Sequence, residues 1–283
     1  MDWTPGGLSE DVEDRRGSSG GGFGGGGLGI IGLIFLVILS LVTGRNYIGS
    51  YLSGGGAGPS RAAVASPDEE RSFQLVQFVL DDVQNTWTTI LPAQTGKEYR
   101  HAKLVVFRDY TQSGCGVAQS QTGPFYCPTD EKVYIDLGFW DELRRLGGST
   151  ADFAQAYVIA HELGHHVQNI LGIERQVRWL SRQDPSEQNP LSVKLELQAD
   201  CFAGIWAHST AERHIIDQVD VAEGLKAAAA VGDDHIQKMS RGAVSPETFT
   251  HGTSAQRIEW FKRGLDEGKV SACQTFEAGA GSF

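Results

Sequence analysis

The sequence predicts a mainly helical α+β fold with a small β-sheet, preceded by one transmembrane helix. Three observations support this prediction: an uncharged apolar run near the N-terminus, two short β-rich stretches, and several later segments with helical patterns. The 283 residues can bury a sizeable core, and their 40% hydrophobic content is ordinary for a globular protein. The sequence shows no internal repeat at the period of a solenoid or propeller, so we expect a single folded domain after the apolar run.

The region before this domain divides into three predicted segments. Residues 1–27 are polar and then glycine-rich, which is typical of a flexible tail. Residues 28–44 contain mainly Leu, Ile, Val, Phe and Gly, and no charged residue occurs between Arg16 and Arg45. This segment therefore predicts one transmembrane helix. Residues 45–65 are rich in Gly, Ser and Ala and form a predicted linker.

A cleaved signal peptide is the alternative interpretation of the apolar run. Ala63 and Ala65 are suitable for cleavage, but they lie about twenty positions beyond the run, which is too far for a signal peptide. Arg15 and Arg16 favour a cytoplasmic N-terminus, although Arg45 and Arg61 on the other side weaken this charge argument. We therefore expect a single-pass protein whose folded domain lies outside the cytoplasm.

The cysteines are consistent with that location. Cys115, Cys127, Cys201 and Cys273 are the four cysteines of the chain, and none belongs to a Cys-x-x-Cys pair of the kind that holds structural zinc. A short, turn-rich loop separates the first two, which favours Cys115–Cys127 and leaves Cys201–Cys273 as the second disulfide. Disulfides are expected in an oxidising compartment, whereas four buried thiols are the alternative.

The folded domain is expected to comprise residues 66–283. Ser66 is suited to cap a first helix, with Pro67 in the first turn and Glu69 placed to complete a capping box.

Two β-rich stretches follow this helix, Leu104–Phe107 and Val133–Leu137, and they bracket a loop rich in Gly and Pro. The remainder of the domain is predicted to be mainly helical, with a late helix that starts near Ser254.

A metal-binding pattern lies in a helix predicted for residues 152–171, which ends at Gly172. His161, Glu162 and His165 form an H-E-x-x-H motif. Because four residues make a little over one helical turn, the two imidazoles project from the same face and can bind one ion. The surrounding residues are apolar enough to be buried, so the polar motif requires a partner such as a metal.

A second helix, predicted for residues 192–208, offers the remaining groups. Glu196 and Asp200 lie one turn apart on one face of this helix. Catalytic zinc usually has three protein ligands and leaves the fourth position to water. Glu196 is therefore the candidate third ligand, and Asp200 is the candidate partner for the second nitrogen of a ligating imidazole. An exposed acidic pair is the alternative.

This combination resembles the gluzincin metallopeptidases, in which a glutamate on a later helix completes the zinc site. Other stretches resemble the bacterial family described as "putative neutral zinc metallopeptidase". These stretches are Gly114-Cys115-Gly116, Gly123 to Pro128, Val133 to Asp136 and Thr250 to Arg257. The resemblance extends from the membrane segment nearly to the C-terminus, and it implies a zincin-like metallopeptidase domain in the bacterial inner membrane.

The residues then predict hydrolysis of a peptide bond in a peptide or protein substrate. Zn²⁺ polarises the scissile carbonyl and the attacking water, and Glu162 acts as general base. His251 is the first candidate for stabilising the oxyanion, and Tyr134 or Tyr157 are the alternatives. His166 points about a hundred degrees away from His165 around the helix and is expected to be structural.

Other interpretations remain open. A zinc-stabilised membrane scaffold without turnover is the alternative function, although Glu162 argues against it, and a zinc hydrolase of another amide or of cell-wall peptide is a third. The stretch Val133–Asp136 is either an edge strand that pairs with extended substrate or an ordinary core strand. The net charge of −11 disfavours nucleic acid as a partner. The sequence does not predict the oligomeric state.

Overall fold

The computed structural model describes residues 1–17, 66–120 and 123–276. The predicted transmembrane helix at residues 28–44 and the linker at 45–65 lie outside these residues. Among the described residues, no helix combines the length and the apolar character that a membrane span requires. The described chain is mainly helical with small sheets, which confirms the α+β class.

Four strands form the main sheet, in the order β1-β2-β6-β5. The first three are parallel, and β5 is antiparallel to β6. Apolar runs such as Leu104–Phe107, which is buried throughout, are typical of a strand covered on both faces. A separate hairpin pairs β3 with β4. The bounds are β1 Val12–Asp14, β2 Lys103–Phe107, β3 Tyr110–Ser113, β4 Gly116–Gln119, β5 Phe125–Cys127 and β6 Lys132–Asp136.

Both predicted β-rich stretches are strands, but the edge-strand interpretation of Val133–Asp136 is wrong. This segment belongs to β6, which pairs with β2 on one side and with β5 on the other. Among the described residues, β5 pairs only with β6 and forms the edge of the sheet. The edge strand is therefore β5, which lies in the loop before β6 and is too short to be predicted from its sequence.

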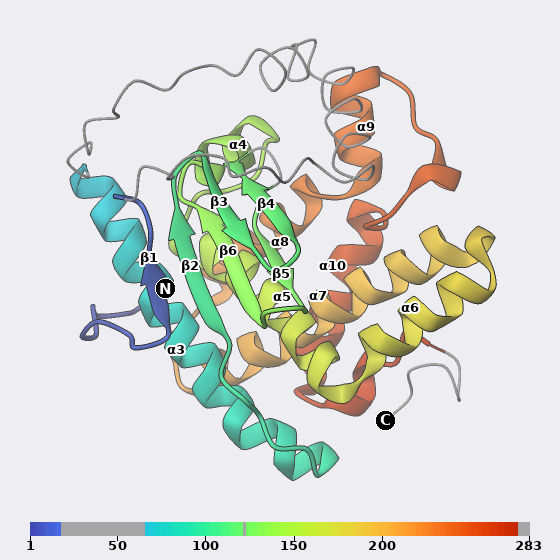
Figure 1. Cartoon of the computed structure of the whole chain (residues 1–283). Helices are drawn as coiled ribbons and strands as arrows, with labels where there is room; N and C mark the ends of the chain where they lie inside the picture. Colours follow the sequence, from blue (N-terminus) through green and yellow to red (C-terminus); the bar gives the residue numbers. More distant parts are fainter. Residues whose placement is uncertain (18–65, 121–122, 277–283) are drawn as a thin grey trace.

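The helices lie behind this sheet and at its sides in the view of Figure 1. The central helix, α5, packs against α3, α7 and α8, and α10 packs against α7 and α8. The α-helices are α3 Pro67–Thr95, α4 Phe139–Arg145, α5 Asp152–Leu171, α6 Ile173–Gln183, α7 Gln188–Glu212, α8 Gln218–Ala230, α9 Asp233–Arg241 and α10 Ser254–Glu267. Short 3₁₀ turns occur at η2 Pro185–Glu187, η3 Pro246–Thr248 and η4 Val270–Cys273.

Local signals set most of the helix ends. α5 has the predicted bounds, and Gly172 ends it in the left-handed conformation with φ of 81°. α7 begins earlier than predicted, because Pro190 lies in its first turn, where a missing N–H is tolerated. Ser66 caps α3 by accepting from the Glu69 amide, but the Glu69 carboxylate pairs with Arg108.

Large aromatic side chains fill the core between α3, α5, α7 and α10. Phe153 stacks on Trp206 with ring centroids 5.7 Å apart. The backbones of α7 and α10 are in close contact, because a Cβ at Gly204 would lie 2.1 Å from the Phe261 carbonyl oxygen. A Cβ at Gly264 would similarly lie 1.9 Å from the Cys201 carbonyl oxygen. The two helices can therefore pack this closely only with glycine at both positions.

The N-terminal residues differ from the expected flexible tail. Residues 12–14 form β1, which extends the sheet in parallel with β2. Asp11 accepts from Lys103 at 2.7 Å, and the Arg16 guanidinium lies 3.8 Å from the centre of the Phe73 ring. The prediction of a tail is wrong for residues 1–17, because backbone pairing, ion pairs and the packing of Met1, Trp3 and Val12 on the core hold this segment.

Both predicted disulfides are present. Cys115–Cys127 joins the turn between β3 and β4 to β5, with Cα atoms 5.8 Å apart. Cys201–Cys273 joins α7 to η4, with Cα atoms 5.6 Å apart. All four cysteines are therefore paired.

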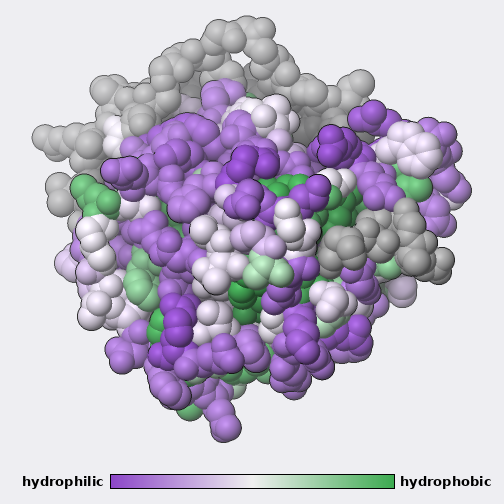
Figure 2. All heavy atoms as spheres, turned by 90° about the horizontal axis from the view of Figure 1, so that it is seen from below, coloured by the Kyte–Doolittle hydropathy of each residue, from purple (hydrophilic) through white to green (hydrophobic). Residues whose placement is uncertain are grey.

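The surface seen in Figure 2 is mostly hydrophilic, with small apolar groups scattered between polar ones. This distribution is normal for a folded domain in water.

Candidate metal centre

The crossing of α5 and α7 brings the predicted ligands together. A Cβ at Gly164, inside the H-E-x-x-H motif, would lie 2.9 Å from the Ala199 carbonyl oxygen on α7. The two backbones are therefore nearly in contact between His161 and His165 on one helix and Glu196 on the other. Glycine at position 164 is what permits this close approach.

The three predicted ligands have the spacing of a tetrahedral site. His161 Nε2 lies 3.2 Å from Glu196 Oε2, and His165 Nε2 lies 3.5 Å from Glu196 Oε1. The three ligand atoms all lie within 4.8 Å of one another. A tetrahedron with metal–ligand bonds of about 2.1 Å has edges of about 3.4 Å. Two imidazoles and one carboxylate at these distances fit a Zn²⁺ ion.

Both imidazoles are held through their other nitrogen. His161 Nδ1 donates to Asp200 Oδ1 at 2.9 Å, which is the contact that the sequence predicted. His165 Nδ1 donates to Gln168 Oε1 at 2.8 Å. Because Nδ1 carries the hydrogen in each case, Nε2 is the atom directed at the metal position. Sequence reasoning missed Gln168, although its place three residues after His165 on the same helix is a usable signal.

The charges in the site are strongly coupled. Burial opposes the charge on His161, but Asp200 and Glu196 outweigh it and raise the His161 pKa to about 9. Glu196 likewise raises the pKa of His165 against the effect of burial. The two imidazoles in turn hold the Glu196 pKa well below its usual value, against the effect of burial. A divalent cation would replace the protons on Nε2, so binding releases protons.

Glu162 lies beside the ligands on α5. Its residue is 8% exposed, and its charge contributes to the raised pKa of His165. His166 is fully buried on another face of the helix, where Nε2 donates to the Arg100 carbonyl at 2.6 Å and Nδ1 lies 2.9 Å from the Tyr126 hydroxyl. These contacts agree with the structural role expected for His166.

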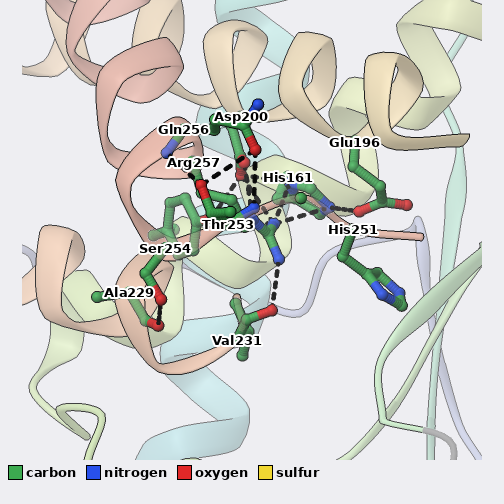
Figure 3. A network of polar contacts seen from close by, with 12 residues as sticks. His161, Glu196, Asp200, Ala229, Val231, His251, Thr253, Ser254, Gln256 and Arg257 are labelled. Atoms are coloured by element: carbon green, nitrogen blue, oxygen red, sulfur yellow. Dashed lines mark hydrogen bonds and ion pairs between the residues drawn. The ribbon is translucent and has the colours of Figure 1, made fainter. Parts of the chain in front are cut away.

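His251 approaches the site from the segment before α10, on the Glu196 side of the network shown in Figure 3. Its side chain is 51% exposed, and Nδ1 lies 3.2 Å from Asp233 Oδ1. Partial burial opposes a charge on His251, but Asp233 and Glu196 raise its pKa overall.

Asp233 fixes the segment that carries His251. Its Oδ2 accepts from the backbone amides of Thr250, His251 and Gly252 at 2.7, 2.6 and 3.1 Å. Sequence reasoning missed Asp233, because nothing local relates it to a segment seventeen residues further along the chain.

The hydroxyls of the two tyrosines considered for the oxyanion role are engaged by carboxylates. The Tyr157 hydroxyl is buried and donates to Asp200, and burial with the nearby Asp200 charge raises its pKa well above the usual value. The Tyr134 hydroxyl donates to Asp130 at 2.7 Å. Of the three predicted candidates, His251 alone lies next to a metal ligand with an exposed ring.

Arg257, on α10, was also missed as a site residue. Its guanidinium bonds Asp200 through two nitrogens, at 2.8 and 2.9 Å. The Thr250–Arg257 stretch, noted in the sequence by resemblance alone, therefore delivers both His251 and Arg257 to the centre.

A model of the family described as "Putative neutral zinc metallopeptidase" matches residues 1–276. The chain belongs to this family. It is 46% identical to the uncharacterized protein YpfJ of Escherichia coli strain K12 over 284 residues, which cover 98% of this chain and 99% of that protein. It is 41% identical to the uncharacterized protein Mb2605 of Mycobacterium bovis over 211 residues, 70% of this chain and 68% of that protein. No solved structure is significantly similar to the chain.

Membership of the zinc metallopeptidase family places the chain, at a coarse level, among the hydrolases and implies zinc as its metal. The cluster of His161, His165 and Glu196 provides a site for that metal.

Proposed function

We propose that the chain is a zinc metallopeptidase that hydrolyses peptide bonds in a peptide or protein substrate, with Glu162 as general base. The observation that carries this proposal is the convergence of His161, His165 and Glu196 from two helices, with Glu162 beside them. Three protein ligands leave one coordination position for water or substrate, which is typical of catalytic sites and not of structural zinc sites.

The metal and the side chains of the protein have different roles in the proposed reaction. Zinc held by the three ligands would supply Lewis-acid polarisation of the scissile carbonyl and of the attacking water. Glu162 accepts the proton of that water as its oxygen attacks the carbonyl carbon. Glu162 then delivers the proton to the amine nitrogen as the C–N bond breaks.

His251 is proposed to stabilise the oxyanion of this reaction. The contact of Nδ1 with Asp233 leaves Nε2 as the nitrogen that can donate to substrate. Asp233 thus orients His251 while it fixes the adjacent backbone.

We also propose that the catalytic domain lies on the non-cytoplasmic side of a bacterial inner membrane, attached through residues 28–44. The two disulfides support an oxidising compartment. Residues 1–17 pack on the same folded body as the catalytic domain, through the pairing of β1 with β2.

The proposed function is tested by zinc analysis together with a broad peptide-cleavage screen on the purified chain. The wild type is expected to bind a single zinc and to cleave peptides. Glu162→Gln should keep the zinc and lose at least about a hundredfold in turnover, because it removes the base but no ligand. His161→Ala and His165→Ala should lose both zinc and activity.

Glu142→Gln, on the exposed surface of α4, is the matched control and should behave as wild type. Full activity of Glu162→Gln would refute its role as base. Zinc binding by the wild type without any cleavage would favour a zinc-stabilised scaffold instead.

A further inference from the structure

Arg257 is a buried cation that contacts Asp200 and His161 of the proposed metal site. The residue is 3% exposed, on the side of α10 that faces α5 and α7. A guanidinium in such a position costs several kcal/mol unless its donors are paired. Nε donates to Asp200 Oδ2 at 2.8 Å, Nη2 to Asp200 Oδ1 at 2.9 Å, and Nη1 to the Val231 carbonyl at 3.2 Å.

Arg257 and two further donors fix the orientation of the Asp200 carboxylate. The paired contact with Arg257 sets the plane of the carboxylate, since both oxygens are bonded to one planar group. Oδ1 also accepts from the Tyr157 hydroxyl and from His161 Nδ1. Asp200 is fully buried, and Arg257 is its only cationic side-chain partner apart from His161 among the described residues.

The position of the guanidinium also limits how His161 can turn. Nη2 lies 3.3 Å from His161 Nδ1 and 3.5 Å from Nε2, so it lies alongside the ring (Figure 3). The shorter contact of Nδ1, at 2.9 Å, is with a carboxylate oxygen, which can only accept. Nδ1 therefore keeps its hydrogen, and Nε2 is the nitrogen that faces the metal position.

Local structure and helix packing both place Arg257. Thr253 and Gln256 form a capping box that starts α10, and Arg257 follows in the next turn. The close contact of α7 and α10 at Gly204 and Gly264 keeps the guanidinium within reach of Asp200. The chain has other two-pronged arginine–aspartate pairs, such as Arg213 with Asp82, but the Arg213 side chain is 41% exposed.

We propose that Arg257 is a positioning residue that orients His161 for zinc binding by fixing Asp200. This inference rests on the metal site of the proposed function and extends it to a residue on a third helix. Arg257 is not one of the three residues that converge on the metal position. Its effect is to hold the carboxylate that selects the His161 tautomer.

The test compares zinc affinity, measured by chelator competition, in the full-length wild type, Arg257→Gln, Asp200→Asn and the double variant. Arg257→Gln should weaken zinc binding by about 10- to 100-fold, and it should alter the absorption spectrum of the Co²⁺-substituted protein. If Arg257 acts through Asp200, the double variant should bind zinc as Asp200→Asn does. Arg257→Gln alone leaves the buried Asp200 carboxylate without its arginine partner and could fail to fold. The double variant has no such carboxylate, so its zinc affinity can still be compared with that of Asp200→Asn.

Arg213→Gln is the control, because it removes a similar arginine fork from the end of α7, remote in sequence from the ligands. It should retain wild-type zinc affinity and Co²⁺ spectrum.

Wild-type zinc affinity in Arg257→Gln, with only the melting temperature lowered, would reduce Arg257 to a structural role and overturn the inference. Additive losses in the double variant would also overturn it, since they would show that Arg257 acts independently of Asp200. A wild type that binds no zinc would refute the proposed function itself, which distinguishes the two failures.

Discussion

At the scale of single residues, the exposed side chain of His251 is held by the largely buried Asp233. His251→Ala should lower kcat by about 100- to 1000-fold, because it removes a donor to the oxyanion. Zinc content should be unchanged, because His251 is not one of the three ligands. Asp233→Asn should produce a smaller loss of kcat, since it weakens the contacts that hold residues 250–252.

Steady-state kinetics with parallel zinc analysis measures these effects. His214→Asn is the control, since His214 is an exposed histidine with positive φ, a conformation that asparagine tolerates. Unchanged turnover in His251→Ala would remove this residue from the mechanism.

Gly164 is a second residue-scale determinant, because it sets the distance between α5 and α7. In Gly164→Ala, the new methyl would lie 2.9 Å from the Ala199 carbonyl oxygen and 3.1 Å from its Cα, so the helices must separate. We expect the free energy of unfolding to fall by about 1–3 kcal/mol. Zinc affinity should fall by about tenfold, because the ligands lie on opposite sides of this contact.

Denaturant unfolding and chelator competition measure the two quantities. Gly7→Ala adds the same methyl where nothing lies within 4 Å, and it should leave both unchanged. Normal zinc affinity in Gly164→Ala would show that the ligands tolerate a wider helix spacing.

At the scale of elements, β1 depends on ionised carboxylates. Burial raises the pKa of Asp11 and Glu13, but Lys103 with His101 and Lys132 with Arg15, respectively, lower both overall. Arg16 lowers the pKa of Asp14. Since these folded-state pKa values lie below the ordinary ones, the carboxylates stabilise the segment above about pH 4, and this stabilisation is lost as the pH falls through the folded values.

Acidification below about pH 4 should therefore release residues 1–17 before the helical core unfolds. A fluorescent dye on Gly7→Cys should show falling anisotropy in this range, while the same dye on Glu187→Cys, at the turn before α7, should not. Simultaneous changes at both positions would mean that β1 unfolds only with the whole domain.

The comparison of β1 with α5 shows what the sequence could and could not predict. α5 was predicted with its bounds, because an apolar pattern and Gly172 encode it locally, and helix geometry alone places His161 and His165 on one face. β1 has no such pattern, because its register with β2 joins residues about ninety positions apart. The contacts of Arg257 and Asp233 were missed for the same reason. Arg257 reaches Asp200 only when α10 packs on α7, and Asp233 reaches residues 250–252 only when α9 lies against the segment before α10.

At the scale of the whole molecule, residues 1–17 and 66–276 form parts of one folded body. Arg16, next to the end of the first described range, contacts Glu69 at 3.4 Å, near the start of the second. The family model also begins at residue 1, so the N-terminal segment belongs to the region that the family shares. Arg16 and Glu69 thus lie at neighbouring points of the same body.

This arrangement predicts that the N-terminal segment and the catalytic domain lie on the same side of the membrane. In intact spheroplasts, a membrane-impermeant maleimide should label Gly7→Cys and Glu187→Cys alike, and the two disulfides predict labelling of both from outside. Permeabilised cells supply the control for accessibility of each cysteine. Labelling of Glu187→Cys alone would place a membrane between the two segments. In that case β1 could not pair with β2 in the cell, and the result would favour one crossing of the membrane between the two segments.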